Sequence, residues 1–243
     1  MLLNVALTFV WLTAVTGPPP VTAVYPSGPV ISDHTLRVSI EFASPQESPI
    51  LPRLSLRNQD HSMLTGAFLE QELWSPNRKQ LTILFDPGRL KTDLGRQRTL
   101  GAPLEGQSNI TLSLDETVIK SWSVKHSRCR AIAVSEWQIL LPHSGRVTPL
   151  SVTFPEPIDF QARHLIAVVD STGRRVKGNE ALTDFERKWT FTPERSWSSG
   201  TYRLLIHPDL ENPCGDQIGD AFEHSIQDAP PLTLSRTFRI SGN

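Results

Sequence analysis

The chain has 243 residues, and its 24 basic and 25 acidic side chains leave a formal net charge of −1. Such a balance gives no long-range attraction for nucleic acid or for an anionic membrane, so we expect neither as a partner. A hydrophobic fraction of 38% and this length suit a soluble protein of two domains, each with its own core. The 20 prolines and 14 glycines indicate many turns and favour an all-β fold.

The chain begins with an apolar segment, Leu2–Val15, that is followed by three prolines at 18–20. The segment is shorter than the roughly 18 to 20 residues that a transmembrane helix needs, and the prolines end any helix. We therefore predict a signal peptide over residues 1–17, no integral membrane segment after its removal, and a secreted, periplasmic or cell-envelope location. Because no lysine or arginine precedes the apolar segment, a buried first strand stays open as the alternative.

The first half of the chain, residues 18–128, contains seven short segments in which apolar residues alternate with polar ones or form a buried run. These predicted strands are Val21–Tyr25, Thr35–Phe42, Arg53–Arg57, Leu64–Leu69, Leu81–Phe85, Ile110–Leu114 and Val118–Val124. Turn-forming residues separate several of them, as at Asn58–Asp60 and Asp86–Gly88. Seven strands at this spacing favour a β-sandwich, and Gly88–Leu94 is interpreted as a loop with room for one turn of helix.

The second half, residues 129–243, shows the same alternation with turns between the segments. Its predicted strands are Trp137–Leu141, Leu150–Phe154, Leu165–Val169, Trp189–Pro193, Tyr202–Ile206 and Leu232–Ile240. Asn179–Lys188 has apolar residues three or four positions apart but is only ten residues long, so it is interpreted as a loop with room for one turn of helix. We therefore predict a second β-sandwich, with the boundary near Ser127–Ala131.

The two halves repeat each other at a fixed offset of 112 residues. Leu36–Phe42 aligns with Thr148–Phe154, and the match persists as far as Gly66 and Gly178. Apolar residues occupy every second position in both segments, which indicates one β unit used twice. The two phenylalanines that end the aligned segments should therefore occupy equivalent positions in two cores.

Several motifs of the second half follow in a fixed order: an entry turn, a strand with a proline corner, a strand that ends in proline, a Gly-x-Tyr strand and an acidic turn. They are Pro142–Gly145, Val152–Asp159, Trp189–Pro193, Gly200–Leu204, Asp209–Glu211 and Gly215–Asp216. In order and spacing this half resembles the SbsA-type Ig-like domains of exported bacterial proteins. The first half resembles them more weakly, through Trp74–Pro76 and Leu81–Phe85.

The resemblance implies two tandem immunoglobulin-like β-sandwich domains, 18–128 and 129–243, after an N-terminal signal segment. It implies a non-enzymatic structural or protein-interaction module of the cell envelope or extracellular space. The expected partner is an unidentified protein or envelope component, and no cofactor is expected.

Cys129 and Cys214 are the two cysteines of the chain, and both lie in the second half. In an oxidising compartment they are candidates for one disulfide bond. Two buried free thiols are the alternative, and the sequence leaves both open. Without further cysteines or histidines at ligand spacing, the pair makes a poor metal site.

No catalytic, cofactor-binding or metal-binding residue is assigned from the sequence. There is no Gly-x-Ser-x-Gly motif, and His143 and Ser144 are explained by a turn that ends at Gly145. Glu70 and Glu72 lie two positions apart, and we interpret them as exposed strand charges. We therefore expect no catalytic activity.

An acidic segment near the C-terminus is the best candidate for a cation site. It contains His207, Asp209, Glu211, Asp216 and Asp220, and carboxylate oxygens are the ligands that calcium prefers. The simpler interpretation is a solvated loop whose side chains bond their own backbone. The seven histidines of the chain show no short repeat spacing.

A carbohydrate-binding module is the alternative function, and it requires Trp74, Trp122 or Trp197 to lie exposed in a row. The aromatic residues are more simply explained as core residues between two sheets. A hydrolase without a recognisable motif is a weaker alternative. Asn109–Thr111 is a glycosylation sequon, a pattern that also occurs by chance.

Overall fold

The computed structural model describes residues 19–86, 103–127, 129–130, 133–218 and 234–242. In these parts of the chain the regular elements are β-strands and three short 3₁₀-helices, Leu51–Arg53 (η1), Val134–Glu136 (η2) and Phe160–Leu165 (η3). The fold is all-β, as predicted. The predicted signal peptide and the segment Gly88–Leu94 lie outside the described residues.

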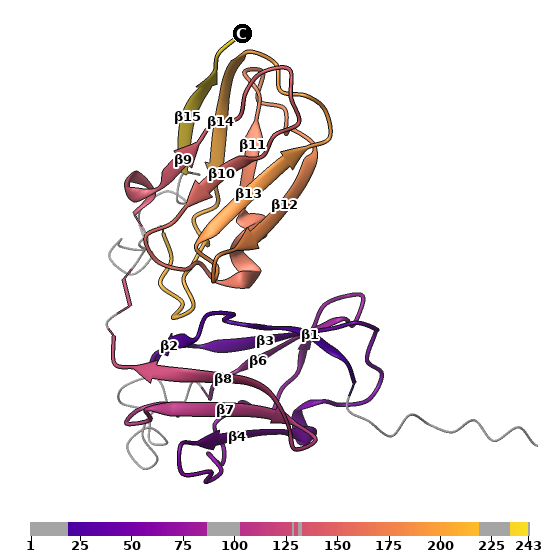
Figure 1. Cartoon of the computed structure of the whole chain (residues 1–243), viewed down its shortest axis with the longest axis vertical. Coiled ribbons are helices and arrows are strands. Elements are labelled where there is room, and N and C mark those ends of the chain that lie inside the picture. The colour runs from indigo at the N-terminus through magenta and orange to yellow at the C-terminus, as the bar shows by residue number, and fades with distance from the viewer. Residues whose placement is uncertain (1–18, 87–102, 128, 131–132, 219–233, 243) are drawn as a thin grey trace, which may run out of the picture.

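The first half forms two sheets that enclose one core (Figure 1). One sheet has the strand order β1-β3-β6-β5, and the other has the order β2-β8-β7-β4. The strands are β1 (Val21–Tyr25), β2 (Val30–Ser32), β3 (Arg37–Phe42), β4 (Leu54–Asn58), β5 (Leu73–Trp74), β6 (Gln80–Leu84), β7 (Asn109–Leu114) and β8 (Thr117–Lys125). Described neighbours run antiparallel except β2 and β8, which are parallel.

The second half encloses its own core between a sheet of order β12-β13-β10-β9 and a sheet of order β11-β14-β15. The strands are β9 (Gln138–Leu140), β10 (Leu150–Thr153), β11 (Ile166–Val169), β12 (Gly178–Thr183), β13 (Lys188–Pro193), β14 (Gly200–Ile206) and β15 (Leu234–Ile240). This division of seven strands is that of the immunoglobulin fold. The first half has the same order, with its first strand divided into β1 and β2 on opposite sheets.

Alternation of side chains along the strands builds each core. In β13, Trp189 and Phe191 are buried, and in β14, Tyr202 and Leu204 are buried against them in the same cluster. The Tyr202 hydroxyl donates to the carbonyl oxygen of Ser198 at 3.1 Å. Immunoglobulin folds make the same contact at the start of the sixth strand. The conspicuous aromatic residues of the second half are therefore core residues.

Phe42 and Phe154 occupy equivalent positions, as the repeat predicts. They are 3% and 2% exposed, and each belongs to the core of its own half. The backbone N–H of Phe42 donates to Lys79, and that of Phe154 donates to Arg187, both at 2.8 Å. Lys79 directly precedes β6 and Arg187 directly precedes β13, which take the same place in the strand order of their halves. The aligned segments are thus one β unit used twice.

The turns after β4 and after β11, the corresponding strands of the two halves, also match. The side-chain oxygen of Asn58 accepts the backbone N–H groups two and four residues later, at 3.0 and 2.9 Å. Asp170, at the aligned position, accepts the corresponding two groups at 2.9 and 3.1 Å. A short polar side chain that satisfies the turn backbone in this way explains why the repeat keeps Asn or Asp at this position.

The structure corrects the sequence-based elements in three places. Asn179–Thr183 is not a loop, because it belongs to β12, which pairs along its whole length with β13; only residues 184–187 of the predicted loop form a turn. As an edge strand, β12 buries no residue fully and so lacks a clear apolar alternation. Leu64–Leu69 is not a strand, and isolated bridges at Met63 and Phe68 replace it. β2 and β5 were not predicted, because segments of three and two residues are too short to show a period.

Candidate functional site

The two sandwiches meet at a junction. The second sandwich contributes the loop after β14, the helix η3 and the turn between β12 and β13. The first sandwich contributes mainly the β1–β3 region. The loop after β14 comes first. The backbone N–H of Leu36 donates to the carbonyl oxygen of Pro213 at 3.0 Å. Gly215 follows with φ +84°, and a Cβ on it would lie 2.4 Å from Leu36 Cδ1. The backbone conformation at 215 therefore favours glycine, and a Cβ there would also force the end of the Leu36 side chain to move.

Arg37, the first residue of β3, lies between two carboxylates of the second sandwich. Its Nε is 3.5 Å from Asp159 Oδ2, and its Nη2 forms an ion pair with Glu211. The three side chains are 21%, 7% and 19% exposed. Burial raises the pKa of Asp159 and of Glu211, although the Arg37 charge acts in the opposite direction. The guanidinium therefore neutralises carboxylates that are costly to bury.

The helix η3 presents further contacts to the first sandwich. Its N-cap residue, Asp159, accepts the N–H of Gln161 at 2.8 Å, and the Gln161 amide donates to Thr82 Oγ1 at 2.9 Å. The ring of Phe160 stacks on the ring of Tyr25 with centroids 3.5 Å apart. Burial, followed by the negative charges of nearby carboxylates, raises the pKa of Tyr25 to about 12. The phenol therefore stays protonated in alkaline solutions in which an ordinary tyrosine, with a pKa of 10, would ionise.

Glu186, in the turn between β12 and β13, is the third buried carboxylate of the junction. It is 4% exposed, and its Oε2 accepts the backbone N–H of Ser27 at 3.0 Å. Burial raises its pKa and lowers the pKa of Lys120, whose ammonium donates to the carbonyl oxygen of Ser27 at 2.5 Å. Glu186 and Lys120 thus bind the backbone N–H and the carbonyl oxygen of the same residue, Ser27, in the turn between β1 and β2.

These charged groups leave almost no space between them. The cavity that Tyr25, Arg37, Asp159 and Glu186 line has a volume of about 10 Å³. That volume holds one water-sized molecule at most. Groups with shifted pKa values often mark a catalytic site, but here they contact one another instead of a ligand pocket.

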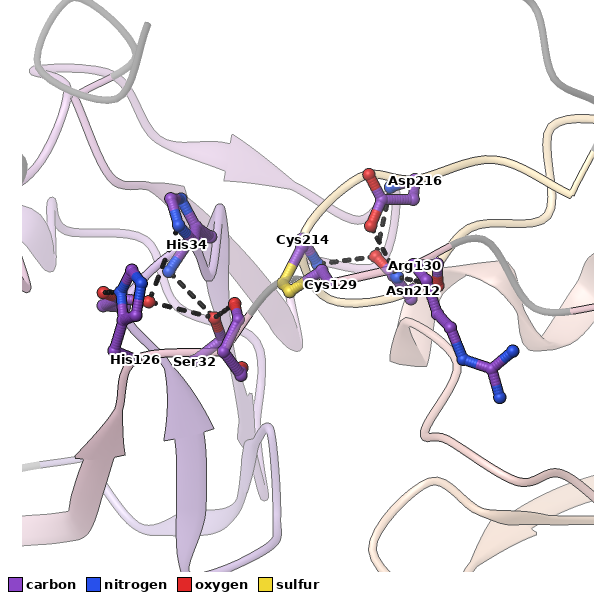
Figure 2. The surroundings of a disulfide bond; sticks show 10 residues. Ser32, His34, His126, Cys129, Arg130, Asn212, Cys214 and Asp216 are labelled. Atoms are coloured by element: carbon purple, nitrogen blue, oxygen red, sulfur yellow. Dashed lines mark hydrogen bonds and ion pairs between the residues drawn. A yellow bond between two sulfur atoms is a disulfide. The ribbon is translucent and has the colours of Figure 1, made fainter. Parts of the chain in front are cut away.

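A larger cavity of about 310 Å³ lies beside the junction, next to the cysteines. In the structure the sulfur atoms of Cys129 and Cys214 are bonded, with the two Cα atoms 6.2 Å apart (Figure 2). The side-chain amide of Asn212 donates to the carbonyl oxygen of Arg130 at 2.9 Å, so the connection between the sandwiches is attached twice to the loop after β14. The described lining of this cavity contains no histidine.

The described side chains of the acidic segment that we considered as a calcium site are engaged with other groups of the protein. Glu211 pairs with Arg37, and His207 accepts the N–H of Asp209 at 3.2 Å. The Asp216 carboxylate accepts from the Asn212 amide at 2.9 Å. These side chains bond within the loop and across the junction, and Asp220 lies outside the described residues.

One cluster of ligand-type side chains was missed in the sequence. Asp33, His34 and His126 place a carboxylate oxygen and two ring nitrogens within 4.8 Å of one another, and among the described residues no other His, Cys, Asp or Glu trio does so. Burial opposes ionisation of Asp33, but the hydrogen bond and charge of His126 and the charge of His34 hold its pKa below the ordinary value. The separation of 93 positions between Asp33 and His126 left no signal in sequence spacing.

The tryptophans do not form an exposed row. Trp122 and Trp197 are 2% and 3% exposed, and their indole N–H groups donate to backbone carbonyl oxygens at 2.9 and 2.8 Å. Trp74 is half-buried and donates to Glu72. The arrangement required for a carbohydrate-binding face is absent from the described residues.

The structure also tests the sequence interpretations of Glu70 and Glu72 and of His143 and Ser144. Glu72 is not an exposed strand charge, because it precedes β5 and accepts three hydrogen bonds, whereas Glu70 is exposed. Gly145 has φ +73° and donates its N–H to Trp197, so His143 and Ser144 lie in a tight turn, as predicted.

No family model and no curated protein matches the chain. Similar solved structures include alpha-2-macroglobulin from Escherichia coli spanning domains MG0-NIE-MG1, with 17% identity over 46% of this chain and 34% of that chain and a TM-score of 0.29. Titin domains Z1Z2 in complex with telethonin share 10% identity with this chain, over 95% of this chain and 100% of that chain, with a TM-score of 0.25. Domains 5–6 of the S-layer protein SbsC share 10% identity with this chain, over 92% of this chain and 99% of that chain, with a TM-score of 0.27. With TM-scores this low, the immunoglobulin-like fold rests on the strand order above.

Within the described residues, no helix combines the length and the apolar character that crossing a membrane requires.

Proposed function

We propose that this protein is an exported, non-enzymatic structural or protein-interaction module, in which two immunoglobulin-like domains are held at a fixed mutual angle. The domains are residues 18–128 and 129–243, and residues 1–17 are a signal peptide. The motifs Val152–Asp159 and Gly200–Leu204 support membership of the second domain in the SbsA-type group.

The junction carries this proposal. The half-buried Arg37 and the buried Asp159 and Glu186 surround only about 10 Å³ of space. Charged groups that would otherwise suit acid–base chemistry are thus used to attach one sandwich to the other. A protein that must keep two β-sandwiches in one orientation needs such an interface, whereas an enzyme needs the same groups to face a substrate.

Small-angle X-ray scattering of the protein without residues 1–17 tests the fixed angle. We expect one rigid arrangement to fit the scattering curve, and the same curve in low and moderate salt. A curve that only a broad ensemble of interdomain angles can fit would contradict the proposal. Turnover in a broad panel of hydrolase substrates would contradict the absence of catalytic activity.

Export is tested separately by expressing the full chain in a bacterium and sequencing the N-terminus of the accumulated protein by mass spectrometry. We expect the mature chain outside the cytoplasm to begin near residue 18. Retention of Met1 on protein that stays in the cytoplasm would reject the signal peptide without affecting the rigid junction.

A further inference from the structure

Parallel pairing of β2 with β8 brings Asp33, His34 and His126 together. Ser32 and Lys125 are paired residues at the ends of these strands, and the Asp33 N–H extends the ladder by donating to the Lys125 carbonyl oxygen at 3.1 Å. The residues that follow leave both strands at the same end. The three side chains therefore meet at a corner of the first sandwich, where the connection to the second sandwich begins. Figure 2 shows His34 and His126 side by side there.

The separations between the ligand atoms fit a small metal ion. Asp33 Oδ2 is 2.7 Å from His126 Nδ1, and Asp33 Oδ1 is 3.8 Å from His34 Nε2. Tetrahedral zinc, with bonds of about 2.0 to 2.1 Å, keeps its ligand atoms about 3.3 Å apart. The observed separations lie on either side of this value, and one ligand atom from each residue lies within 4.8 Å of the other two, so the side chains would bind an ion by rotating toward it.

The surroundings fix the carboxylate and leave the imidazoles accessible. The Asp33 side chain is 9% exposed, and the Ser32 hydroxyl lies 3.3 Å from its Oδ1. The same Ser32 oxygen accepts the backbone N–H of His34 at 3.0 Å. A second residue that orients a ligand in this way is common at metal sites. The side chains of His34 and His126 are 52% and 80% exposed, so an ion and completing water molecules can enter.

We propose that Asp33, His34 and His126 bind one divalent transition-metal ion that accepts imidazole and carboxylate ligands, such as zinc or copper. Two imidazoles with one carboxylate suit these metals better than calcium or magnesium, which prefer oxygen ligands only. The bound ion joins the β2–β3 corner to the first residues after β8. The connection between the sandwiches follows β8, so the metal would hold its first residue, His126, and the disulfide holds it three positions later, at Cys129.

The test uses untagged full-length protein that has been treated with chelator and dialysed. Calorimetric titration with Zn²⁺ measures stoichiometry and affinity, and electron paramagnetic resonance of the Cu²⁺ form reports the bound nitrogens. We expect one ion per chain and hyperfine coupling to two imidazole nitrogens. Absence of binding, or coupling to no nitrogen, would overturn the proposal.

Variants locate the ion. His34→Ala and His126→Ala remove exposed rings and should each weaken Zn²⁺ binding at least about tenfold. The matched control is His207→Ala, because His207 is 51% exposed and also lies beside a carboxylate, 3.4 Å from Asp209. Circular dichroism checks that each variant folds. An unchanged affinity in either site variant, or an equal loss in the control, would reject the three-residue site.

Discussion

The Glu72 carboxylate accepts hydrogen bonds from three N–H groups. Its Oε1 accepts the backbone groups of Ile50 and Leu51, both at 2.6 Å, and its Oε2 accepts the Trp74 indole at 2.7 Å. Burial raises the pKa of this carboxyl, but the hydrogen bonds together outweigh burial and hold the pKa below its ordinary value of 4.5. The stability that the carboxylate contributes is therefore present above pH 4.5 and is lost as the pH falls through the lowered pKa.

We expect Glu72→Gln to lower the free energy of unfolding by about 1 to 2 kcal/mol at neutral pH. The loss is modest because the side chain is partly exposed and solvent screens its charge. The difference from the natural protein should shrink in acid, where Glu72 is protonated in both folded and unfolded chains. Urea unfolding at neutral and acidic pH measures it. Glu70→Gln, two positions away and exposed, is the control and should change little. Equal losses in the two variants would contradict this role of Glu72.

At the scale of elements, Gly66 and Gly178 align in the repeat but are glycine for different reasons. Gly66 has φ +64° with open space around it, so the backbone conformation requires it. Gly178 begins β12, where a Cβ would lie 2.4 Å from the Thr192 carbonyl oxygen and 2.5 Å from Phe191 Cζ. Both halves therefore have glycine at this position, although it lies in a turn in the first half and in a paired strand in the second.

We expect Gly178→Ala to destabilise the protein by about 1 to 3 kcal/mol, because the new methyl group would force β12 away from β13. Thermal unfolding monitored by tryptophan fluorescence measures the loss, since Trp189 lies in β13. Gly242→Ala is the control, because its Cβ would make an ordinary contact at 3.8 Å. A melting temperature equal to that of the control would show that the contact at 178 is not restrictive.

Sequence patterns predicted the strands that bury alternate side chains and end in recognisable turns, such as Trp189–Pro193 with its two buried aromatic residues. They failed for β12, because an edge strand needs only half-buried residues. They also failed for the Asp33 cluster and the junction. Asp33 with His126 and Arg37 with Glu211 are 93 and 174 positions apart, and only the paired strands and docked loops bring them together.

At the scale of the whole molecule, Arg37 is the cation that makes the junction possible. Its removal leaves the buried Asp159 and the half-buried Glu211 without the cation that neutralises them, although Asp159 still accepts the N–H of Gln161. We expect Arg37→Ala to cost about 2 to 4 kcal/mol at neutral pH, because an unpaired buried carboxylate keeps its desolvation penalty. Burial already raises the pKa of both carboxyls, and loss of the cation would raise it further. The folded protein then binds protons more readily than the unfolded chain, so the cost should decrease as the pH falls.

Urea unfolding of Arg37→Ala at neutral pH and near pH 5 measures this dependence. Arg174→Ala is the control, because its side chain is 83% exposed and its pairing with Asp170, at 3.6 Å, is open to solvent. We expect little change in the control at either pH. A cost for Arg37→Ala that grows in acid would contradict the assignment of the buried carboxylates.

The bond between Cys129 and Cys214 also affects the stability of the whole second sandwich. It closes a loop of 85 positions that contains most of the second core. In the chain-entropy view a loop of this length stabilises by about 4 to 5 kcal/mol through its effect on the unfolded chain. We expect the variant with both cysteines changed to serine to lose stability in this range. Protein unfolded without reductant should fail to react with iodoacetamide and should be lighter than the reduced form by two hydrogens. A single change, Cys129→Ser, should cost as much as the double change, because one bond is lost in both. Reaction of both thiols before reduction would show that the cysteines are free and that the junction has no covalent support from them.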